Sequence, residues 1–285
     1  MKYFYMIILI ASGLYSSAST VDSTKTEAEP LLSLTLAAIY SSNVNYYGQT
    51  AAEKLPYALS NASLRFRNGI YLSASAYKLF NYGSGISAAD LGAGYQLSIT
   101  KNLTGTVGYS RSFYPANSPL LQAANENNLS GSLAYDWNWI NTSLSADYAF
   151  GESEDIFTSF SNSKLISLGS IFKDKDIITM EPGVDVIAGT REFYKTYINK
   201  KNIKDKLLEK FPGKALPPGL SKADTTTFPY NRFSLLSYNI KLPLAYSRTH
   251  YTFEAAYMVS VLNNKKEKLL NRAQSFFNLS FYYLF

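Results

Sequence analysis

The chain has 285 residues, of which 46% are hydrophobic and only 17% are charged, and its formal net charge is +6. Its 24 Tyr and 17 Phe favour a long boundary between apolar and wet surroundings, because the tyrosine ring is apolar and its hydroxyl is polar. The absence of Cys excludes a disulfide framework, thiolate metal sites, a Cys nucleophile and a lipid-anchored Cys. A single histidine, His250, leaves little room for imidazole chemistry.

The N-terminal residues have the pattern of a cleavable signal peptide. Lys2 supplies the positive charge, residues 3–14 form a short apolar core, and Ser16, Ser17 and Ala18 are small residues suited to cleavage. A transmembrane anchor is the alternative, but the apolar run is well below the roughly 20 residues that a spanning helix needs. We therefore predict a signal peptide over residues 1–19 and a polar extension over residues 20–30.

From residue 31 onward, apolar and polar residues alternate almost to the end of the sequence. In the first run, Leu32, Leu34, Leu36, Ala38 and Tyr40 fall on one face. A period of two indicates strands with one apolar and one polar face. Twelve such runs are predicted as strands, over residues 32–41, 57–68, 70–80, 91–99, 103–110, 129–137, 141–150, 165–173, 177–190, 233–246, 251–262 and 275–285.

Two prolines interrupt this pattern. Pro182 and Pro243 lie inside predicted strands, where a proline removes one hydrogen bond of the ladder. They either weaken these two strand assignments or mark bulges.

The connections between the runs alternate in length. The short connections are residues 68–69, 100–102, 138–140, 173–176 and 247–250. The long connections are residues 44–55, 81–87, 114–126, 151–163, 191–232 and 263–274. Short turns on one rim and long loops on the other are the layout of outer-membrane β-barrels, in which the short rim is periplasmic and the long loops are extracellular. The sequence thus predicts an all-β fold, a transmembrane antiparallel up-and-down β-barrel of about twelve strands over residues 31–285.

The composition of the two faces separates a membrane barrel from its alternative, a soluble sandwich or lipocalin-like barrel. A soluble protein would expose its polar face to bulk water, where Lys and Glu are common. Here Ser, Gly, Ala, Thr and Asn dominate that face. Aromatic residues lie towards the strand ends, where they suit the headgroup level of a bilayer.

The last run has the most specific pattern. Phe277, Leu279, Phe281, Tyr283 and Phe285 all fall on one face. This run resembles the C-terminal assembly signal of bacterial outer-membrane proteins, with Phe281, Tyr283 and Phe285 as its core. The resemblance implies a place in the bacterial outer membrane, contact with outer-membrane lipid and lipopolysaccharide, and insertion by the outer-membrane assembly machinery.

Some outer-membrane barrels of about this size are phospholipases or lipid A deacylases, and resemblance to them implies a His near an outer-leaflet Ser or Asn. The single His250 lies instead in the predicted periplasmic turn 247–250. We therefore expect no enzyme, no catalytic, metal-binding or cofactor-binding residues, and no cofactor. A site made only of carboxylates stays open as an alternative.

The polar face also holds ionisable residues of both signs. They are Arg65, Arg67, Asp90, Asp136, Asp147, Glu181, Asp185, Lys241 and Glu254. One hypothesis is that they line an aqueous lumen, and the alternative is a salt-bridge network that plugs the barrel. Barrels of about eight strands are filled by side chains whereas those of about sixteen leave a channel, so twelve is marginal. The many small residues on this face favour a narrow pore.

Residues 191–232 contain ten Lys or Arg against four acids, an excess equal to the net charge of the whole chain. Ile203, Leu207 and Phe211 recur every four residues, which predicts a short amphipathic helix. The basic residues of this loop include Lys195, Lys200, Lys201, Lys204, Lys206 and Lys210. Such an extracellular loop either attracts anionic solutes, pairs with lipopolysaccharide phosphates, or folds into the barrel as a constriction. Nucleic acid is not an expected partner, because no aromatic stacking platform accompanies the charges.

Together these patterns predict a narrow porin-like channel for small solutes. The alternative is a non-conducting barrel that presents surface loops, as an adhesin or an envelope anchor. An outer-membrane lipid hydrolase ranks below both.

Overall fold

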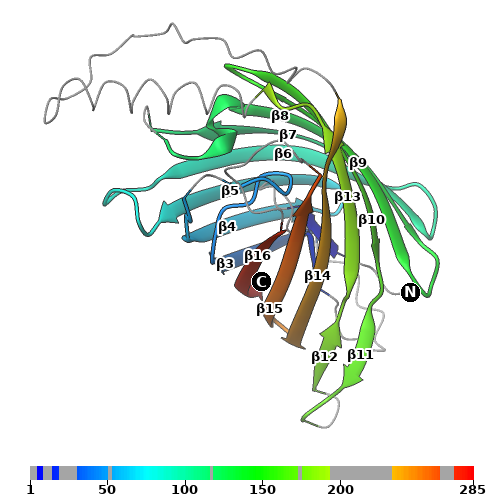
Figure 1. Cartoon of the computed structure of the whole chain (residues 1–285). Helices are drawn as coiled ribbons and strands as arrows, with labels where there is room; N and C mark the ends of the chain where they lie inside the picture. The colour runs from blue at the N-terminus through cyan, green and yellow to red at the C-terminus, as the bar shows by residue number, and fades with distance from the viewer. Residues whose placement is uncertain are drawn as a thin grey trace, which may run out of the picture.

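One antiparallel sheet closes on itself as a barrel (Figure 1). The computed structural model describes residues 5–8, 15–18, 31–50, 53–115, 118–172, 175–192, 233–263 and 273–285. The strands of the barrel are β3 (Leu32–Ser41), β4 (Tyr57–Phe66), β5 (Ile70–Leu79), β6 (Ala88–Ser98), β7 (Leu103–Phe113), β8 (Asn127–Asp136), β9 (Asn141–Phe150), β10 (Glu154–Ser163), β11 (Ile166–Gly169), β12 (Asp176–Met180), β13 (Gly183–Gly189), β14 (Ser234–Arg248), β15 (Tyr251–Leu262) and β16 (Ala273–Leu284). A separate two-stranded sheet joins β1 (Tyr5–Ile8) to β2 (Tyr15–Ala18). Among the described residues, no helix has the length and apolar character needed to cross a bilayer.

The barrel has twelve strands, as the sequence predicts. The first strand, β3, pairs with the last, β16, and the pairing of β14 with β15 completes the closure. Two of these strands are each divided into two pieces. One consists of β12 and β13, which pair with successive parts of β14. The other consists of β10 and β11, which pair with β13 and β12 respectively. The sheet is therefore an up-and-down barrel in which every strand lies beside its neighbours in the sequence.

The two prolines lie at one gap in this sheet. Strand β13 pairs with β14 as far as Lys241, and β12 pairs with it from Leu244 onward, so Pro243 falls between the two ladders. The backbone N–H of Glu181, next to Pro182, donates to the Pro243 carbonyl at 3.1 Å. Because a proline has no N–H to donate, a shared gap confines the lost hydrogen bonds to one place in the sheet. The prolines mark an irregularity and do not remove the strands.

The predicted long loop over residues 151–163 is wrong, and the predicted strand over 165–173 contains only β11 (Ile166–Gly169), the second piece of a strand that begins at Glu154. Residues 151–153 form a tight turn in which the Gly151 N–H donates to the Ser153 carbonyl at 2.9 Å, and β10 begins at once. Within β10, Ile156 and Phe160 are exposed while Phe157 is buried, so the alternation is present. This run was predicted as a loop because it is rich in Ser, Asn and acidic residues, which are also common in loops. The other eleven predicted strands each coincide with a strand of the barrel.

The outer face of the barrel is apolar, and polar residues occupy much of its inner face. Leu91, Val107, Leu129 and Leu144 point outward and are each more than half exposed, whereas Ser110 on the inner face is buried. The last strand follows the same pattern, with its predicted apolar face outward. An apolar outside around a polar inside is the arrangement of a membrane barrel, and it is the reverse of a soluble β-protein.

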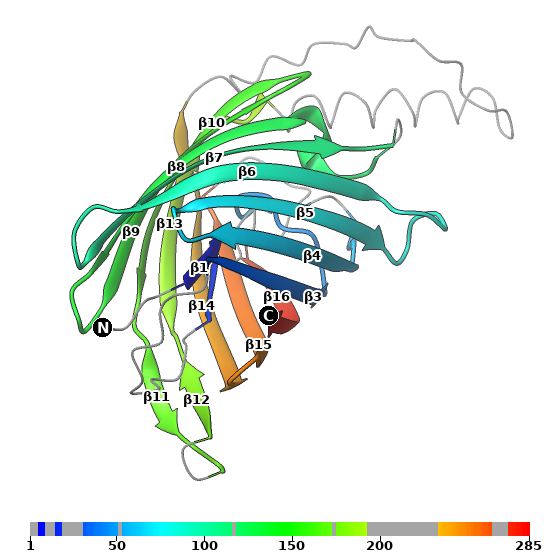
Figure 2. The same cartoon turned by 180° about the vertical axis from the view of Figure 1, so that it is seen from behind.

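The two ends of the barrel differ. One end has the short turns, among them the turn closed by Gly69 at a φ of 94° and the turn that contains His250. The His250 carbonyl accepts a hydrogen bond from the Leu284 N–H at 2.7 Å, so the last strand ends beside this turn. Figure 2 shows that β11 and β12 project beyond their neighbours at the same end. The longer connections lie at the opposite end, with the turn 151–153 as the exception.

Candidate functional site

The connection between β3 and β4 turns into the barrel over its described residues, 42–50 and 53–56, and we call it the inward hairpin. At its tip, Tyr46 and Gln49 pair, and each donates its N–H to the carbonyl of the other, at 2.8 and 2.9 Å. Tyr47 and Gly48 between them have φ values of 50° and 82°, as a two-residue turn of type I′ requires. Gln49 is only 1% exposed, so the tip is enclosed by the protein.

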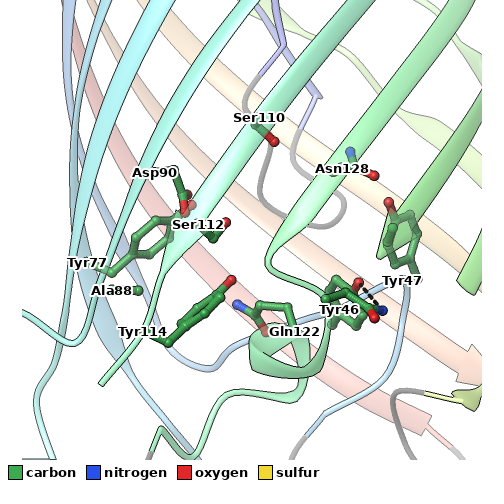
Figure 3. A pocket seen from close by; sticks show the side chains of 12 residues that line it. Tyr46, Tyr47, Tyr77, Ala88, Asp90, Ser110, Ser112, Tyr114, Gln122 and Asn128 are labelled. Atoms are coloured by element: carbon green, nitrogen blue, oxygen red, sulfur yellow. Dashed lines mark hydrogen bonds between the residues drawn. The ribbon is translucent and has the colours of Figure 1, made fainter. Parts of the chain in front are cut away.

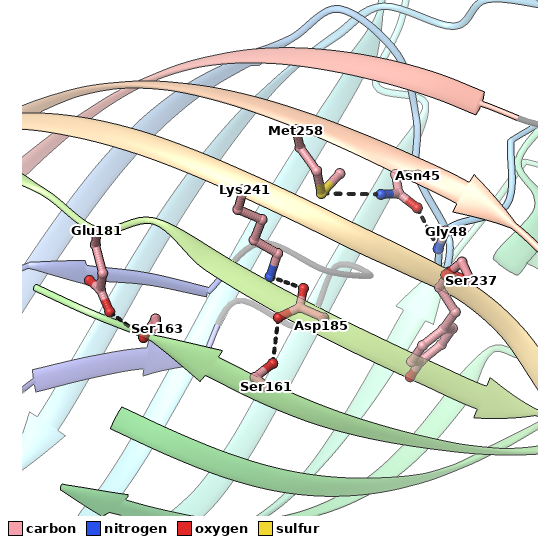
Figure 4. Close-up of polar contacts among 10 residues, drawn as sticks. Asn45, Gly48, Ser161, Ser163, Glu181, Asp185, Ser237, Lys241 and Met258 are labelled. Carbon is pink, nitrogen blue, oxygen red and sulfur yellow. Dashed lines mark hydrogen bonds and ion pairs between the residues drawn. The ribbon is translucent and has the colours of Figure 1, made fainter. Parts of the chain in front are cut away.

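The inward hairpin is fixed to the inner wall at β14 and β15 (Figure 4). The Ser237 hydroxyl donates to the Tyr47 carbonyl at 3.3 Å, and the Ser260 hydroxyl donates to the Gly48 carbonyl at 3.2 Å. The Asn45 side chain accepts a hydrogen bond from the Gly48 N–H at 2.7 Å, which stabilises the turn itself. The tip is thereby held against a wall that lies far away in the sequence.

Aromatic contacts fix the hairpin to a second part of the wall. The rings of Tyr47 and Phe157 on β10 stack at 3.7 Å between centroids, and Tyr46 meets Phe157 edge-on at 5.5 Å. The Asn125 amide donates to the Tyr46 hydroxyl at 3.4 Å. Burial raises the pKa of Tyr46 well above its ordinary value, against the smaller lowering effect of Asn125, so the phenol is neutral at physiological pH.

Apolar side chains fill the part of the interior beside β3, β4 and β5. Loop residues Val44, Leu55 and Leu120 pack there against inward-facing side chains of the wall. The full cluster is Ile39, Val44, Leu55, Tyr57, Leu59, Tyr77, Leu79, Ala88 and Leu120. Because this cluster fills the interior beside β3, β4 and β5, any open space is confined to the part of the interior beside the other strands.

Between the inward hairpin and strands β5 to β9 lies a cavity of about 50 Å³ (Figure 3). Tyr46, Tyr47, Tyr77 and Tyr114 contribute aromatic rings to its lining, and Asp90 contributes a carboxylate. Burial, followed by the nearby charge of Asp90, raises the pKa of Tyr114, which keeps this hydroxyl a neutral donor.

Two of the predicted acids lie at this cavity, and further predicted residues form contacts deeper along the wall. Asp90 lines the cavity, and Asp147 accepts a hydrogen bond from its lining residue Asn128 at 3.3 Å. Lys241 forms an ion pair with Asp185 across β13 and β14 (Figure 4). The polar wall therefore holds both acids near the hairpin and a charge pair below it.

The other predicted residues are spread over the wall and the short-turn rim. Glu181 accepts a hydrogen bond from the Ser163 hydroxyl at 2.7 Å. Arg65 donates to the Gln96 side chain, and Glu254 lies in register with the buried Ser280 on the inner face. Arg67 is exposed in the turn after β4, and Asp136 is the last residue of β8. The predicted set is thus not one cluster.

A polar cluster that sequence reasoning missed lies at the long-loop rim. Asp155 is fully buried and accepts hydrogen bonds from the Thr190 hydroxyl at 2.6 Å, the Glu192 N–H at 2.7 Å and the Asn125 amide at 3.1 Å. The Ser153 hydroxyl donates to Asn125 at 2.6 Å. The cluster was missed because residues 151–163 imitate a loop, although their alternation is the signal that locates it.

Other predictions lie outside the described residues. Of the N-terminal residues 1–30, only β1 and β2 are described. The described chain stops at Glu192 and resumes at Phe233, so the predicted helix and most of the basic loop fall between them. The six lysines named above for the basic loop all lie outside the described part: Lys195, Lys200, Lys201, Lys204, Lys206 and Lys210.

No protein-family model matches the chain, and no curated protein matches it. Among solved structures, the KdgM porin is similar with a TM-score of 0.48 at 9% identity, over 88% of this chain and 98% of the porin. LpxR from Salmonella typhimurium is similar with a TM-score of 0.48 at 11% identity, over 89% of this chain and 100% of LpxR. The NanC porin has a TM-score of 0.44 at 9% identity, over 88% and 98%. These neighbours are outer-membrane β-barrels, the class of fold that the closed sheet with its apolar outer face defines by itself.

Proposed function

We propose that this barrel is a narrow channel for small solutes in the bacterial outer membrane. The observation that supports this most directly is the inward hairpin, which crosses the interior and is fixed to the wall at Tyr47 and Gly48. A loop fixed in this way sets the width of the path, while the strands supply the wall. A twelve-stranded barrel lies between the filled eight-stranded ones and the open sixteen-stranded ones, so the loop decides how much space is left.

The chemistry of the inner wall supports an aqueous path. On β7 and β8, the inward-facing positions include Thr106, Gly108, Ser110, Ser130 and Ser132, all of them small. Small polar side chains leave room along the axis and offer hydroxyl groups to water. We therefore place the path beside β7 and β8, away from the apolar cluster.

The experiment is conductance of the purified full chain in planar bilayers. We expect discrete steps, and no step above background at micromolar protein would contradict the channel. A variant in which residues 44–54 are replaced by Gly-Asn-Gly should show larger steps, because the constriction is gone. The control shortens the connection 80–87, where an added Cβ at Gly83 or Gly85 meets nothing within 4 Å, and it should conduct as the wild type does.

The second candidate is a non-conducting barrel that presents surface loops. The apolar cluster favours it, because side chains such as Leu55, Leu59 and Leu120 occupy interior volume that a wide pore would leave empty. The same experiment separates the two functions. A silent wild type together with a conducting hairpin replacement identifies the inward hairpin as a plug.

We also propose that the chain is not an enzyme. The cluster around Asp155 is the feature that most favours a lipid hydrolase, since it combines a carboxylate, a Ser and an Asn at the long-loop rim. However, Asp155 is fully buried and its oxygens already accept hydrogen bonds from Thr190 and Glu192. Release of fatty acid from lipid A or phospholipid vesicles that disappears in Asp155→Asn would contradict this proposal.

The remaining proposals concern location and partners. The exposed apolar outer face suits outer-membrane lipid, and the basic loop suits lipopolysaccharide phosphates. The C-terminal run with Phe281, Tyr283 and Phe285 suits recognition by the outer-membrane assembly machinery, after export by the signal peptide at residues 1–19. Cell fractionation with detection of the mature N-terminus tests the location and the export. We expect recovery in the outer membrane with residues 1–19 removed, and recovery in the inner membrane would contradict both proposals.

A further inference from the structure

The cavity beside the inward hairpin has an excess of hydrogen-bond acceptors. Asp90 is 8% exposed, and its Oδ1 has no hydrogen-bond partner among the described residues. Within the same described part, Gln122 Oε1 and Asn128 Oδ1 are buried and also have none. All three residues line the cavity. A buried acceptor without a donor is costly, so these three atoms together favour a ligand rich in donors.

The orientation of the Asn128 amide is determined by its neighbour. Its Nδ2 donates to the Asp147 carboxylate at 3.3 Å, and a carboxylate accepts but does not donate. The amide oxygen is therefore the atom left without a donor. The side chains of Ser112 and Tyr77 lie beside the Asp90 carboxylate at the same side of the cavity. Figure 3 shows Asp90 and Ser112 together on one side of the cavity, with Asn128 on the next strand.

The charge and the rings favour a cation over a neutral donor. The lining contains the Asp90 carboxylate and, in the part of the chain that the structure describes, no Lys or Arg. Asp147 adds a second carboxylate directly behind Asn128. A buried carboxylate is stabilised by an opposite charge, and the faces of tyrosine rings attract cations. Tyr46, Tyr77 and Tyr114 supply such rings.

The size of the cavity limits the ligand. One water-sized group needs roughly 10–15 Å³ measured in the same way, so the cavity of about 50 Å³ admits about three to five such groups. This is the size of a short primary alkylammonium ion, and it is too small for a sugar ring.

We infer that this cavity binds the ammonium group of small primary amines on the solute path, with Asp90 as its counter-ion and Gln122 and Asn128 as further acceptors. Only the location of this site on a solute path rests on the proposed channel function. The acceptors, the charge and the size describe a binding site whether or not the barrel conducts.

The test is titration of the detergent-purified full chain with ethylammonium, followed by calorimetry or ligand-observed NMR. We expect saturable binding, and a loss of affinity of roughly tenfold or more in Asp90→Asn, because a charge-assisted hydrogen bond is lost. The matched control is Asp136→Asn, since Asp136 ends β8 at the opposite rim. It should bind as the wild type does.

Two further probes identify the chemistry. Tetramethylammonium has the charge but no N–H donor, and ethanol has a donor but no charge, so both should bind much more weakly than ethylammonium. No saturable binding of ethylammonium, equal binding by Asp90→Asn, or equal binding of ethanol would each overturn the inference. Binding in micelles does not require conduction, so a silent bilayer experiment contradicts the channel and leaves this site intact.

Discussion

Gly48 occupies the position at which the inward hairpin meets the wall. A Cβ added there would lie 2.0 Å from Ser237 Oγ and 2.9 Å from Ser260 Oγ, and its φ of 82° is unfavourable for a β-branched residue. We predict that Gly48→Val displaces the hairpin tip and increases the single-channel conductance, while the barrel still assembles. Bilayer recordings measure the first effect, and heat-dependent mobility in gel electrophoresis measures the second.

Gly83 supplies the matched control for this substitution. It also has a positive φ, 60°, but an added Cβ meets nothing within 4 Å. Gly83→Val therefore introduces comparable backbone strain without a steric clash, and its conductance should equal that of the wild type. Equal conductance of Gly48→Val and Gly83→Val would show that the contact with Ser237 does not determine the width of the path.

Tyr71 packs across the inner wall on two glycines. A Cβ at Gly94 would lie 2.3 Å from the Tyr71 hydroxyl oxygen, and one at Gly108 would lie 2.5 Å from it. We predict that Gly108→Ala lowers the unfolding free energy by roughly 1–3 kcal/mol through overpacking, and that adding Tyr71→Ala removes this steric component. Urea unfolding in lipid vesicles measures both. Gly131→Ala, where a Cβ meets nothing within 4 Å, should be close to neutral.

At the scale of the element, Asp155 connects β10 to the chain that leaves β13. Its carboxylate accepts from Thr190 and Glu192, which follow β13, and from Asn125, which precedes β8, so it joins two segments to β10. We predict that Asp155→Ala destabilises the barrel by roughly 1–3 kcal/mol, since it leaves buried donors without an acceptor. The same unfolding assay measures it. The control is Asp136→Ala, which removes an acceptor at the opposite rim, where water replaces it. If Asp136→Ala lowers the unfolding free energy as much as Asp155→Ala does, the burial of the donors is not the cause of the effect.

Strands were predictable wherever one face is apolar and the other is not. Leu91 and Val107 fall on the lipid side because lipid demands apolar side chains at every second position. Residues 154–163 were missed because most of their inward positions are polar, among them Asp155, Ser159 and Ser161, and such residues are also common in loops. Only Ile156 and Phe160 mark the outer face. In a strand that faces a polar interior, only the outward positions distinguish it from a loop, which is half of the usual sequence signal.

The inward hairpin was not predictable, because its position depends on contacts between distant residues. The turn at Tyr47 and Gly48 is local, but its direction is set by Ser237, Ser260 and Phe157, about 110 to 210 residues away in the sequence. Sequence reasoning considered a constriction from the basic loop 191–232. It had no means of choosing the first long loop instead, since nothing within residues 42–56 specifies which wall they contact.

At the scale of the whole molecule, the alternation of connections fixes which residues share an end. Trp139, 66% exposed, lies in a short turn, and Gly83 lies in a long connection at the opposite end. In outer-membrane barrels the short turns face the periplasm. His250 then lies on the periplasmic side, and the inward hairpin enters the barrel from outside the cell. In the proposed channel, a solute arriving from outside meets the inward hairpin and the cavity at Asp90 before the Asp185–Lys241 pair.

The absence of Cys from the sequence makes this orientation directly testable. Single cysteines are introduced as Gly83→Cys and Trp139→Cys, and cells are treated with a membrane-impermeant maleimide. We predict that Gly83→Cys is labelled on intact cells, because the long-loop rim faces outward, and that Trp139→Cys is labelled only after the outer membrane is permeabilised. The reverse pattern would place the short turns outside. The hairpin would then be a constriction at the periplasmic mouth, and solutes from outside would reach the Asp185–Lys241 pair first.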